Sequence, residues 1–130
     1  MKHAEITEAI ISSFYRVYNV LGYGFLEKVY ENAMQIELRK RGLKVQQQAR
    51  MNVYYEGESV GEYCADLLVN DVVIVELKAA ECLCPEHHAQ ILNYLKASKI
   101  EIGLLMNFEP KPDLKRKVFD HPADHPALSV

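Results

Sequence analysis

The sequence has few of the residues that mark several classes of protein. Of its 130 residues, three are cysteine, five are proline and six are glycine. Three thiols give no disulfide framework, which favours a reducing compartment. No apolar run approaches the roughly 20 residues of a membrane-spanning helix, and the amphipathic first 18 residues carry acids, unlike a signal or transit peptide. These absences predict a cytoplasmic protein with no membrane association.

An excess of positive charge is also lacking. The chain has 15 Lys and Arg against 18 Asp and Glu, a formal net charge of −3. A strong, salt-driven binder of duplex DNA usually shows a clear basic excess. Basic residues do gather at 39–44 and 111–117, although solvated helix ends and loops would explain both groups. No GxGxxG, P-loop or GxSxG motif is present, which excludes nucleotide-dependent and serine-hydrolase chemistry of those types.

Apolar residues recur at helical spacing in the first third of the chain. This spacing predicts one helix ending near Gly22 and a second over residues 25–41, closed by Gly42. Leu26, Tyr30, Ala33 and Ile36 would face inward on the second helix.

Beyond Gly42 the apolar period drops to two, which predicts strands over residues 45–55, 60–69 and 72–79. Turns would lie at 56–59 and at Asn70-Asp71. A helix over 89–98, with Pro85 in a possible first turn, and an apolar strand over 100–106 follow, and then a loop at 107–113. The order ααβββαβ predicts an α/β fold with a mixed four-stranded sheet flanked by helices. A single domain would span residues 1–119, with a flexible tail at 120–130.

Charged residues end the apolar stretch VVIVELK, where Glu76 and Lys78 share a face of the third strand. A two-residue turn at Asn70-Asp71 would place Asp66 opposite Val75. A three-residue loop would instead place Asp66 directly opposite Glu76. Two facing carboxylates repel, and a divalent cation bound through oxygen would relieve the repulsion. The alternatives are a structural ion pair or an exposed strand edge protected by charge.

Two helical segments supply further candidates. Glu27 and Tyr30 are three residues apart in the second helix and are therefore neighbours. His87, Gln90 and Tyr94 fall on one face of the later helix, where Gln90 and Tyr94 could approach Lys78 or a phosphate. Glu27 could equally be a solvated glutamate in a first helical turn.

These residues together resemble the PD-(D/E)xK nuclease superfamily and, within it, the GxxExxY family. The naming motif stands as Gly24, Glu27 and Tyr30, and it is followed in order by Asp66, by the ExK of Glu76-Leu77-Lys78, and by the QxxxY of Gln90 and Tyr94. Ala65 replaces the proline of the "PD" pair. The ordered series is more specific than ExK alone, and it spans roughly residues 5 to 119.

The resemblance implies a restriction-endonuclease-like core and metal-dependent hydrolysis of nucleic-acid phosphodiesters, with DNA favoured over RNA as the substrate. Mg²⁺ or Mn²⁺ would be held by Asp66, Glu76 and the Leu77 carbonyl, with Glu27 joining as in exonucleases that carry QxxxY. Lys78 would assist the attacking water. Gln90 and Tyr94 would position the scissile phosphate or the lysine.

Two other hypotheses remain open at this stage. Cys82, Cys84, His87 and His88 invite a zinc site, although the Cys-x-Cys spacing is tighter than usual. The chain could also be a catalytically weak nucleic-acid-binding or regulatory module, because it has little beyond the core to hold DNA. A homo-oligomer or a partner protein would then supply the missing DNA contacts.

Overall fold

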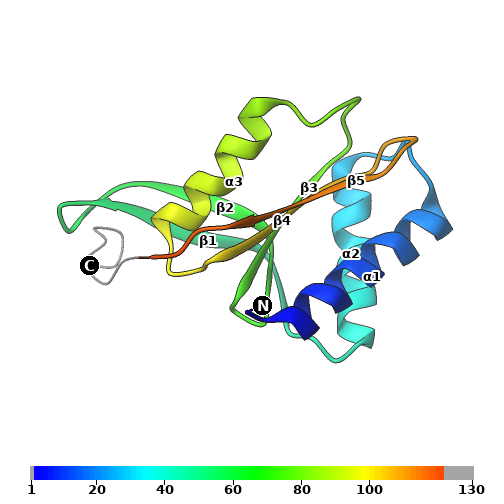
Figure 1. Ribbon diagram of the computed structural model, residues 1–130, viewed down its shortest axis with the longest axis horizontal. Helices are drawn as coiled ribbons and strands as arrows, with labels where there is room; N and C mark the ends of the chain where they lie inside the picture. Colours follow the sequence, from blue (N-terminus) through cyan, green and yellow to red (C-terminus); the bar gives the residue numbers. More distant parts are fainter. Residues whose placement is uncertain (1, 122–130) are drawn as a thin grey trace.

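The computed structural model describes residues 2–121 of the chain. Two helices come first, followed by three strands, a third helix and two more strands (Figure 1). The elements are α1 (Ala4–Leu21), α2 (Glu27–Lys40), β1 (Val45–Tyr55), β2 (Glu58–Val69), β3 (Val73–Lys78), α3 (Pro85–Ala97), β4 (Ile102–Asn107) and β5 (Asp113–Val118).

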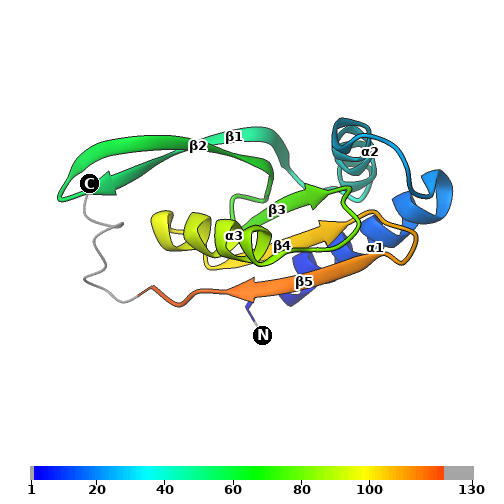
Figure 2. The same cartoon turned by 90° about the horizontal axis from the view of Figure 1, so that it is seen from above.

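The five strands form one mixed sheet in the order β1-β2-β3-β4-β5. All neighbours are antiparallel except β3 and β4, which are parallel and joined through α3. Helices α1 and α2 pack on one face of the sheet and α3 packs on the other (Figures 1 and 2). The predicted α/β class and the mixed sheet flanked by helices are therefore confirmed.

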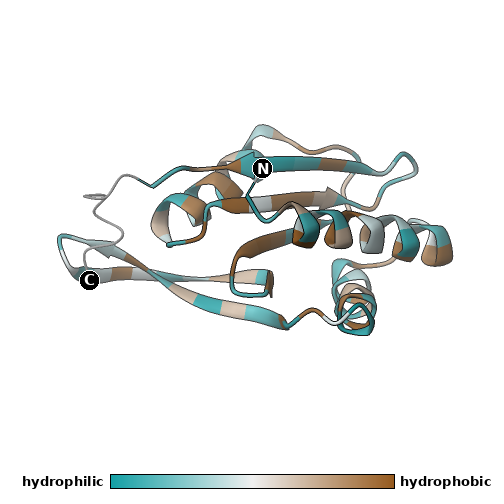
Figure 3. Cartoon of the chain, turned by 60° about the horizontal axis from the view of Figure 1, so that its bottom comes forward, coloured by the Kyte–Doolittle hydropathy of each residue, from teal (hydrophilic) through white to brown (hydrophobic). Residues whose placement is uncertain are grey.

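The main core lies between the sheet and the first two helices. Phe14 of α1, Met34 of α2 and Val75 of β3 are fully buried in it. Strands β3 and β4 are buried along nearly their whole length, and both are mostly brown in Figure 3. Such continuous apolar strands are typical of parallel pairs covered by helices on both faces.

The predicted strand count of four was wrong, because β5 adds a fifth strand. Its sequence DLKRKV is largely charged and its burial pattern is mixed. A charged strand at a sheet edge discourages pairing with other chains. The same charge hid the strand, because the segment lacks the apolar alternation by which strands are predicted.

The inward face of α2 also differs from the prediction. Leu26 is 82% exposed and Ile36 is 62% exposed, whereas Tyr30, Met34 and Leu38 are fully buried. Tyr30, Met34 and Leu38 are four residues apart, which is close to the 3.6 residues of one helical turn. These three side chains therefore point to nearly the same side of α2, and this is the side that packs on the core.

The β2–β3 connection decides which residues face each other at the end of β3. Val69 pairs with Val73 and Leu67 with Val75, which leaves a three-residue loop at 70–72. Asn70 and Asp71 both take positive φ in this loop, a conformation that Asn and Asp tolerate. Of the two predicted turns, the three-residue loop is the one that forms.

The end of the chain is only partly described. The backbone N–H of His121 donates to Glu101 at 3.1 Å. The rest of the predicted flexible tail, residues 122–130, lies outside the described residues. Within residues 2–121, no helix combines the length and apolar character needed to cross a membrane.

Candidate active site

Asp66 and Glu76 meet where β2 and β3 separate. The regular pairing of the two strands ends at Leu67 and Val75, so the next position on each strand carries one of the two acids. The Asp66 N–H donates to Oε2 of Glu76 at 3.1 Å, and the Leu77 N–H donates to Oδ2 of Asp66 at 2.8 Å. Each carboxylate thus occupies the place of a ladder carbonyl and faces the other strand.

Glu76 is the most perturbed acid of this site. It is only 4% exposed, and burial, followed by the hydrogen bond to Asp66 and the charge of Asp66, raises its pKa to about 9. No Lys or Arg forms an ion pair with either acid within the described residues. The pair is therefore a buried acidic site whose repulsion a proton or a bound cation can relieve.

Lys78 lies one pleat beyond Glu76 and connects to α3. Its Nζ is 3.4 Å from Oε1 of Gln90, and Nε2 of Gln90 donates to the Tyr94 hydroxyl at 2.8 Å. The spacing of four on α3 puts Gln90 and Tyr94 on one helical face. The structure therefore brings together Asp66, Glu76, Lys78, Gln90 and Tyr94 from β2, β3 and α3.

Two residues that support this arrangement were missed by sequence reasoning. Tyr63 of β2 stacks on Tyr94 with ring centroids 3.9 Å apart, and its hydroxyl donates to the Tyr94 carbonyl at 2.9 Å. Asn107 is fully buried, and its side-chain amide exchanges two hydrogen bonds with the backbone of Ala80. Asn107 thereby fixes the chain just after Lys78. Neither contact has a local sequence signal, because each joins distant segments.

Glu31 and Gln48 were missed as well. Glu31 is 4% exposed, and its Oε1 accepts from Gln48 Nε2 at 2.7 Å. Glu31 lies one helical turn after Glu27, on the same face of α2. That spacing is the signal that could have found it, but the exposed Glu27 fitted the motif and Glu31 did not.

The GxxExxY residues divide into a structural part and an exposed part. Tyr30 is fully buried and stacks on Phe108 with centroids 4.0 Å apart. Its hydroxyl donates to the Gly22 carbonyl at 2.8 Å and accepts from the Phe25 N–H at 3.2 Å. Tyr30 therefore fastens the connection between α1 and α2, in which Gly24 takes a φ of +105° that favours glycine.

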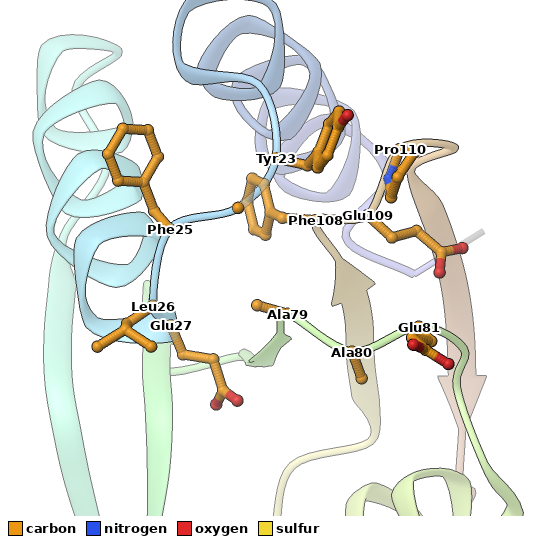
Figure 4. A pocket seen from close by; sticks show the side chains of 11 residues that line it. Tyr23, Phe25, Leu26, Glu27, Ala79, Ala80, Glu81, Phe108, Glu109 and Pro110 are labelled. Carbon is orange, nitrogen blue, oxygen red and sulfur yellow. The ribbon is translucent and has the colours of Figure 1, made fainter.

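Glu27 lies at a cavity of about 300 Å³ beyond the end of β3. In Figure 4, Glu27 stands on one side of the cavity and Glu81 and Glu109 on the other. Ala79 and Ala80, which directly follow Lys78, form part of the wall. Glu27 thus borders the same cavity as the residues that follow β3. It is nevertheless exposed, and it makes none of the contacts that join Asp66 to Glu76.

Removing the Tyr30 hydroxyl should loosen this connection. Tyr30→Phe keeps the stacked ring but leaves the Gly22 carbonyl and the Phe25 N–H without their partner. We expect the free energy of unfolding to fall by about 1–3 kcal/mol, measured by urea denaturation. Tyr55→Phe, at a residue that is 66% exposed, is the matched control and should change little. Equal stability of the two variants would show that the Tyr30 hydroxyl contributes nothing.

The family described as the PD-(D/E)XK nuclease superfamily matches residues 4–118. The chain belongs to the PD-(D/E)XK nuclease superfamily. The match covers every helix and strand of the structure and all seven predicted site residues. Membership in the narrower GxxExxY family stays a prediction.

One solved structure is similar in fold to this chain. The structure titled "Crystal structure of SSO0001" superimposes with a TM-score of 0.56 at 16% sequence identity. The alignment covers 92% of this chain and 61% of the other, so the chain spans about three fifths of that protein. At this identity the likeness shows the fold alone. No curated protein matches the sequence.

Members of the PD-(D/E)XK superfamily generally use divalent metal ions, and part of this site fits such an ion. Two carboxylates held face to face, one of them buried with a raised pKa, are hard oxygen ligands that Mg²⁺ or Mn²⁺ would accept. The Leu77 N–H faces Asp66, and a strand residue directs its N–H and C=O to the same side, so its carbonyl faces the pair too.

Within the described residues, no third acidic side chain joins Asp66 and Glu76 to form a metal site. Within residues 2–121, no three His, Cys, Asp or Glu side chains are placed to hold one metal ion. Glu27 is therefore not grouped with Asp66 and Glu76. Cys82, Cys84, His87 and His88 are likewise not grouped for zinc, and His87 Nδ1 instead accepts from the Cys84 N–H at 3.3 Å. Mg²⁺ commonly binds through one or two carboxylates, waters and substrate phosphates, which the Asp66–Glu76 pair can satisfy.

Proposed function

We propose that the protein is a metal-dependent nuclease that hydrolyses phosphodiester bonds in DNA. The observation that carries the proposal is the pairing of Asp66 and Glu76 across diverging strands, with Lys78 beside them and held by Gln90. Mg²⁺ or Mn²⁺ bound by the two carboxylates and the Leu77 carbonyl would stabilise negative charge on the phosphate oxygens. In this proposal Glu27 is a further acid at the rim, which substrate binding would have to bring closer.

The chain's own side chains account for the rest of the chemistry. The Lys78 ammonium can orient a water for attack on phosphorus or stabilise the charge that develops there. Gln90 accepts from Lys78 and donates to Tyr94, so it fixes the direction of the ammonium. The stacked Tyr63 and Tyr94 rings hold this end of α3 against β2. Attack by water forms a new bond between its oxygen and phosphorus and breaks the bond between phosphorus and the leaving oxygen. The water loses a proton and the leaving oxygen gains one, so one product ends in a phosphate and the other in a hydroxyl.

The test is Mn²⁺-dependent cleavage of labelled single-stranded and duplex DNA by the wild type and by Asp66→Asn. We expect cleavage by the wild type and none by the variant. Mn²⁺ should also stabilise the wild type by about 2.7 kcal/mol at a hundred-fold excess over Kd, seen as a rise in Tm. Asp66→Asn should abolish that rise, while Asp71→Asn, in the exposed β2–β3 loop, should keep both properties.

A second candidate function is a nucleic-acid-binding or regulatory module that keeps the fold without useful turnover. The net charge of −3 favours it, since few positive charges are available to hold DNA. A homo-oligomer or partner protein would then provide the DNA contacts. Mn²⁺ binding at Asp66 without cleavage of any substrate would favour this module over the nuclease.

A further inference from the structure

Gln48 has an unusual backbone conformation for a residue inside a strand. Its φ is +50°, although it lies in the middle of β1 and is not glycine. The other non-glycine residues with positive φ within residues 2–121 lie at a helix start or in turns. Such a strained conformation persists where surrounding contacts enforce it. The pairing of β1 with β2 skips this position, passing from Gln47–Leu67 to Ala49–Ala65.

The side chain of Gln48 lies between two acids. Its Nε2 is 2.7 Å from Oε1 of Glu31 and 3.4 Å from Oδ1 of Asp66. A side-chain amide carries two N–H donors, so one nitrogen can serve both carboxylates. Because this donor is neutral, it can hold Asp66 without adding a positive charge that would compete with a metal ion.

Glu31, the partner of Gln48 in this contact, is itself held in place by other hydrogen bonds. It is almost fully buried, and its Oε2 accepts from Lys28 Nζ at 2.9 Å and from Gln47 Nε2 at 2.6 Å. The acid is thus held by α2 and β1 together. Its remaining oxygen, Oε1, is the one that receives Gln48.

Asp66 is consequently held from two sides. Oδ2 accepts the Leu77 N–H from β3, and Oδ1 faces Gln48 from β1. Ligating carboxylates are commonly hydrogen-bonded by residues around the site, and loss of such a partner typically costs 10–100-fold in metal affinity or activity.

We infer that Gln48 is a positioning residue, whose amide links Glu31 to Asp66 and holds the Asp66 carboxylate ready for a divalent ion. The inference rests on the proposed function, because it gives that site its supporting contact. Gln47 and Gln48 both donate to Glu31, although successive side chains of a regular strand point to opposite faces, and this departure coincides with the left-handed backbone at Gln48.

The first test compares the Mn²⁺ affinity of Gln48→Ala and Gln46→Ala by titration calorimetry. Gln46 is an exposed glutamine on the same strand, so it controls for the loss of a surface amide. We expect about tenfold weaker Mn²⁺ binding by Gln48→Ala and no change in Gln46→Ala. Equal affinities in the two variants would overturn the inference.

Gln48→Gly separates positioning from folding. Glycine accepts positive φ without strain, so this variant should fold at least as readily as Gln48→Ala, yet it also lacks the amide. The same tenfold loss of Mn²⁺ affinity in the glycine variant supports positioning. Recovery of wild-type affinity in Gln48→Gly would mean that the backbone, and not the amide, matters.

A second readout needs neither metal nor activity. In the metal-free protein, the Leu77 N–H donates to Asp66, so its hydrogen exchange reports on how firmly that carboxylate is held. We expect loss of protection at Leu77 in Gln48→Ala and Gln48→Gly but not in Gln46→Ala. If the wild type binds no Mn²⁺, the proposed function fails, whereas unchanged protection at Leu77 would refute the positioning role by itself.

Discussion

Lys78→Ala is expected to reduce Mn²⁺-dependent DNA cleavage by about 10²–10³-fold while Mn²⁺ still binds. The magnitude is typical for loss of one group that stabilises developing charge. Metal binding should survive because an ammonium is not a ligand, and the oxygen donors of Asp66 and Glu76 remain. Initial cleavage rates and calorimetric Mn²⁺ affinities measured on the same preparations would check both halves of the prediction.

Two variants sharpen this test. Lys99→Ala removes an exposed lysine in the loop after α3 and should cleave at the wild-type rate. Lys78→Arg keeps the charge but not the compact shape of the ammonium, so it should recover only part of the activity. Wild-type cleavage by Lys78→Ala would remove Lys78 from the mechanism. Loss of Mn²⁺ binding in that variant would instead mean that Lys78 is needed to form the metal site.

Most of the fold could be predicted because its apolar patterns are strong and local. The helical period before Gly42 predicted the first two helices, and the period of two after it predicted the first three strands in order. Strand β5 could not be predicted in this way, since its position depends on pairing with β4 and its own sequence is charged. The start of β2 was predicted two residues too late, at residue 60 and not at Glu58. Only residues 56 and 57 form the turn, so Glu58 already pairs with Tyr55.

The site was predictable where its residues share one element and less so where they come from several. Glu76 and Lys78 on one strand, and Gln90 and Tyr94 on one helix, follow from spacing alone. Asp66 required the correct loop at 70–72, which the sequence left open between two registers. Gln48, Tyr63 and Asn107 act across elements, so only the assembled sheet reveals their contacts.

The difference between Glu27 and Glu31 shows how a motif can mislead. The motif names the acid at Glu27, which is exposed, whereas the buried acid on that face of α2 is Glu31. Burial with three hydrogen-bond partners makes Glu31 part of the scaffold around Asp66. A functional role for Glu27 would need substrate or metal to draw it in.

Glu76→Gln is expected to stabilise the metal-free protein at pH 7 by roughly 3 kcal/mol. The folded state keeps a proton on Glu76 up to a pKa of about 9, whereas an unperturbed glutamate has a pKa of 4.5. At a pH between these two pKa values, unfolding releases that proton. The free energy of unfolding of the wild type therefore falls as pH rises, by up to about 1.4 kcal/mol per pH unit. Glutamine resembles the protonated acid and carries no proton to release.

Urea denaturation in EDTA from about pH 5 to pH 9 would measure this effect. The wild type should lose stability across that range, and Glu76→Gln should show a much flatter profile. Glu81→Gln, at an exposed position beside the cavity, should follow the wild-type profile. A wild-type profile without a downward slope would mean that Glu76 ionises in the folded protein without cost.

Mn²⁺ should reverse this pH dependence. A metal ion binds the deprotonated carboxylate, so binding must displace the proton and becomes tighter as pH rises. The stabilisation by Mn²⁺ should therefore be larger at pH 8 than at pH 5 in the wild type, and it should be small at both in Glu76→Gln. The same burial and repulsion that weaken the metal-free fold at high pH would then favour metal binding, which links the cost of burying Glu76 to the proposed function of the site.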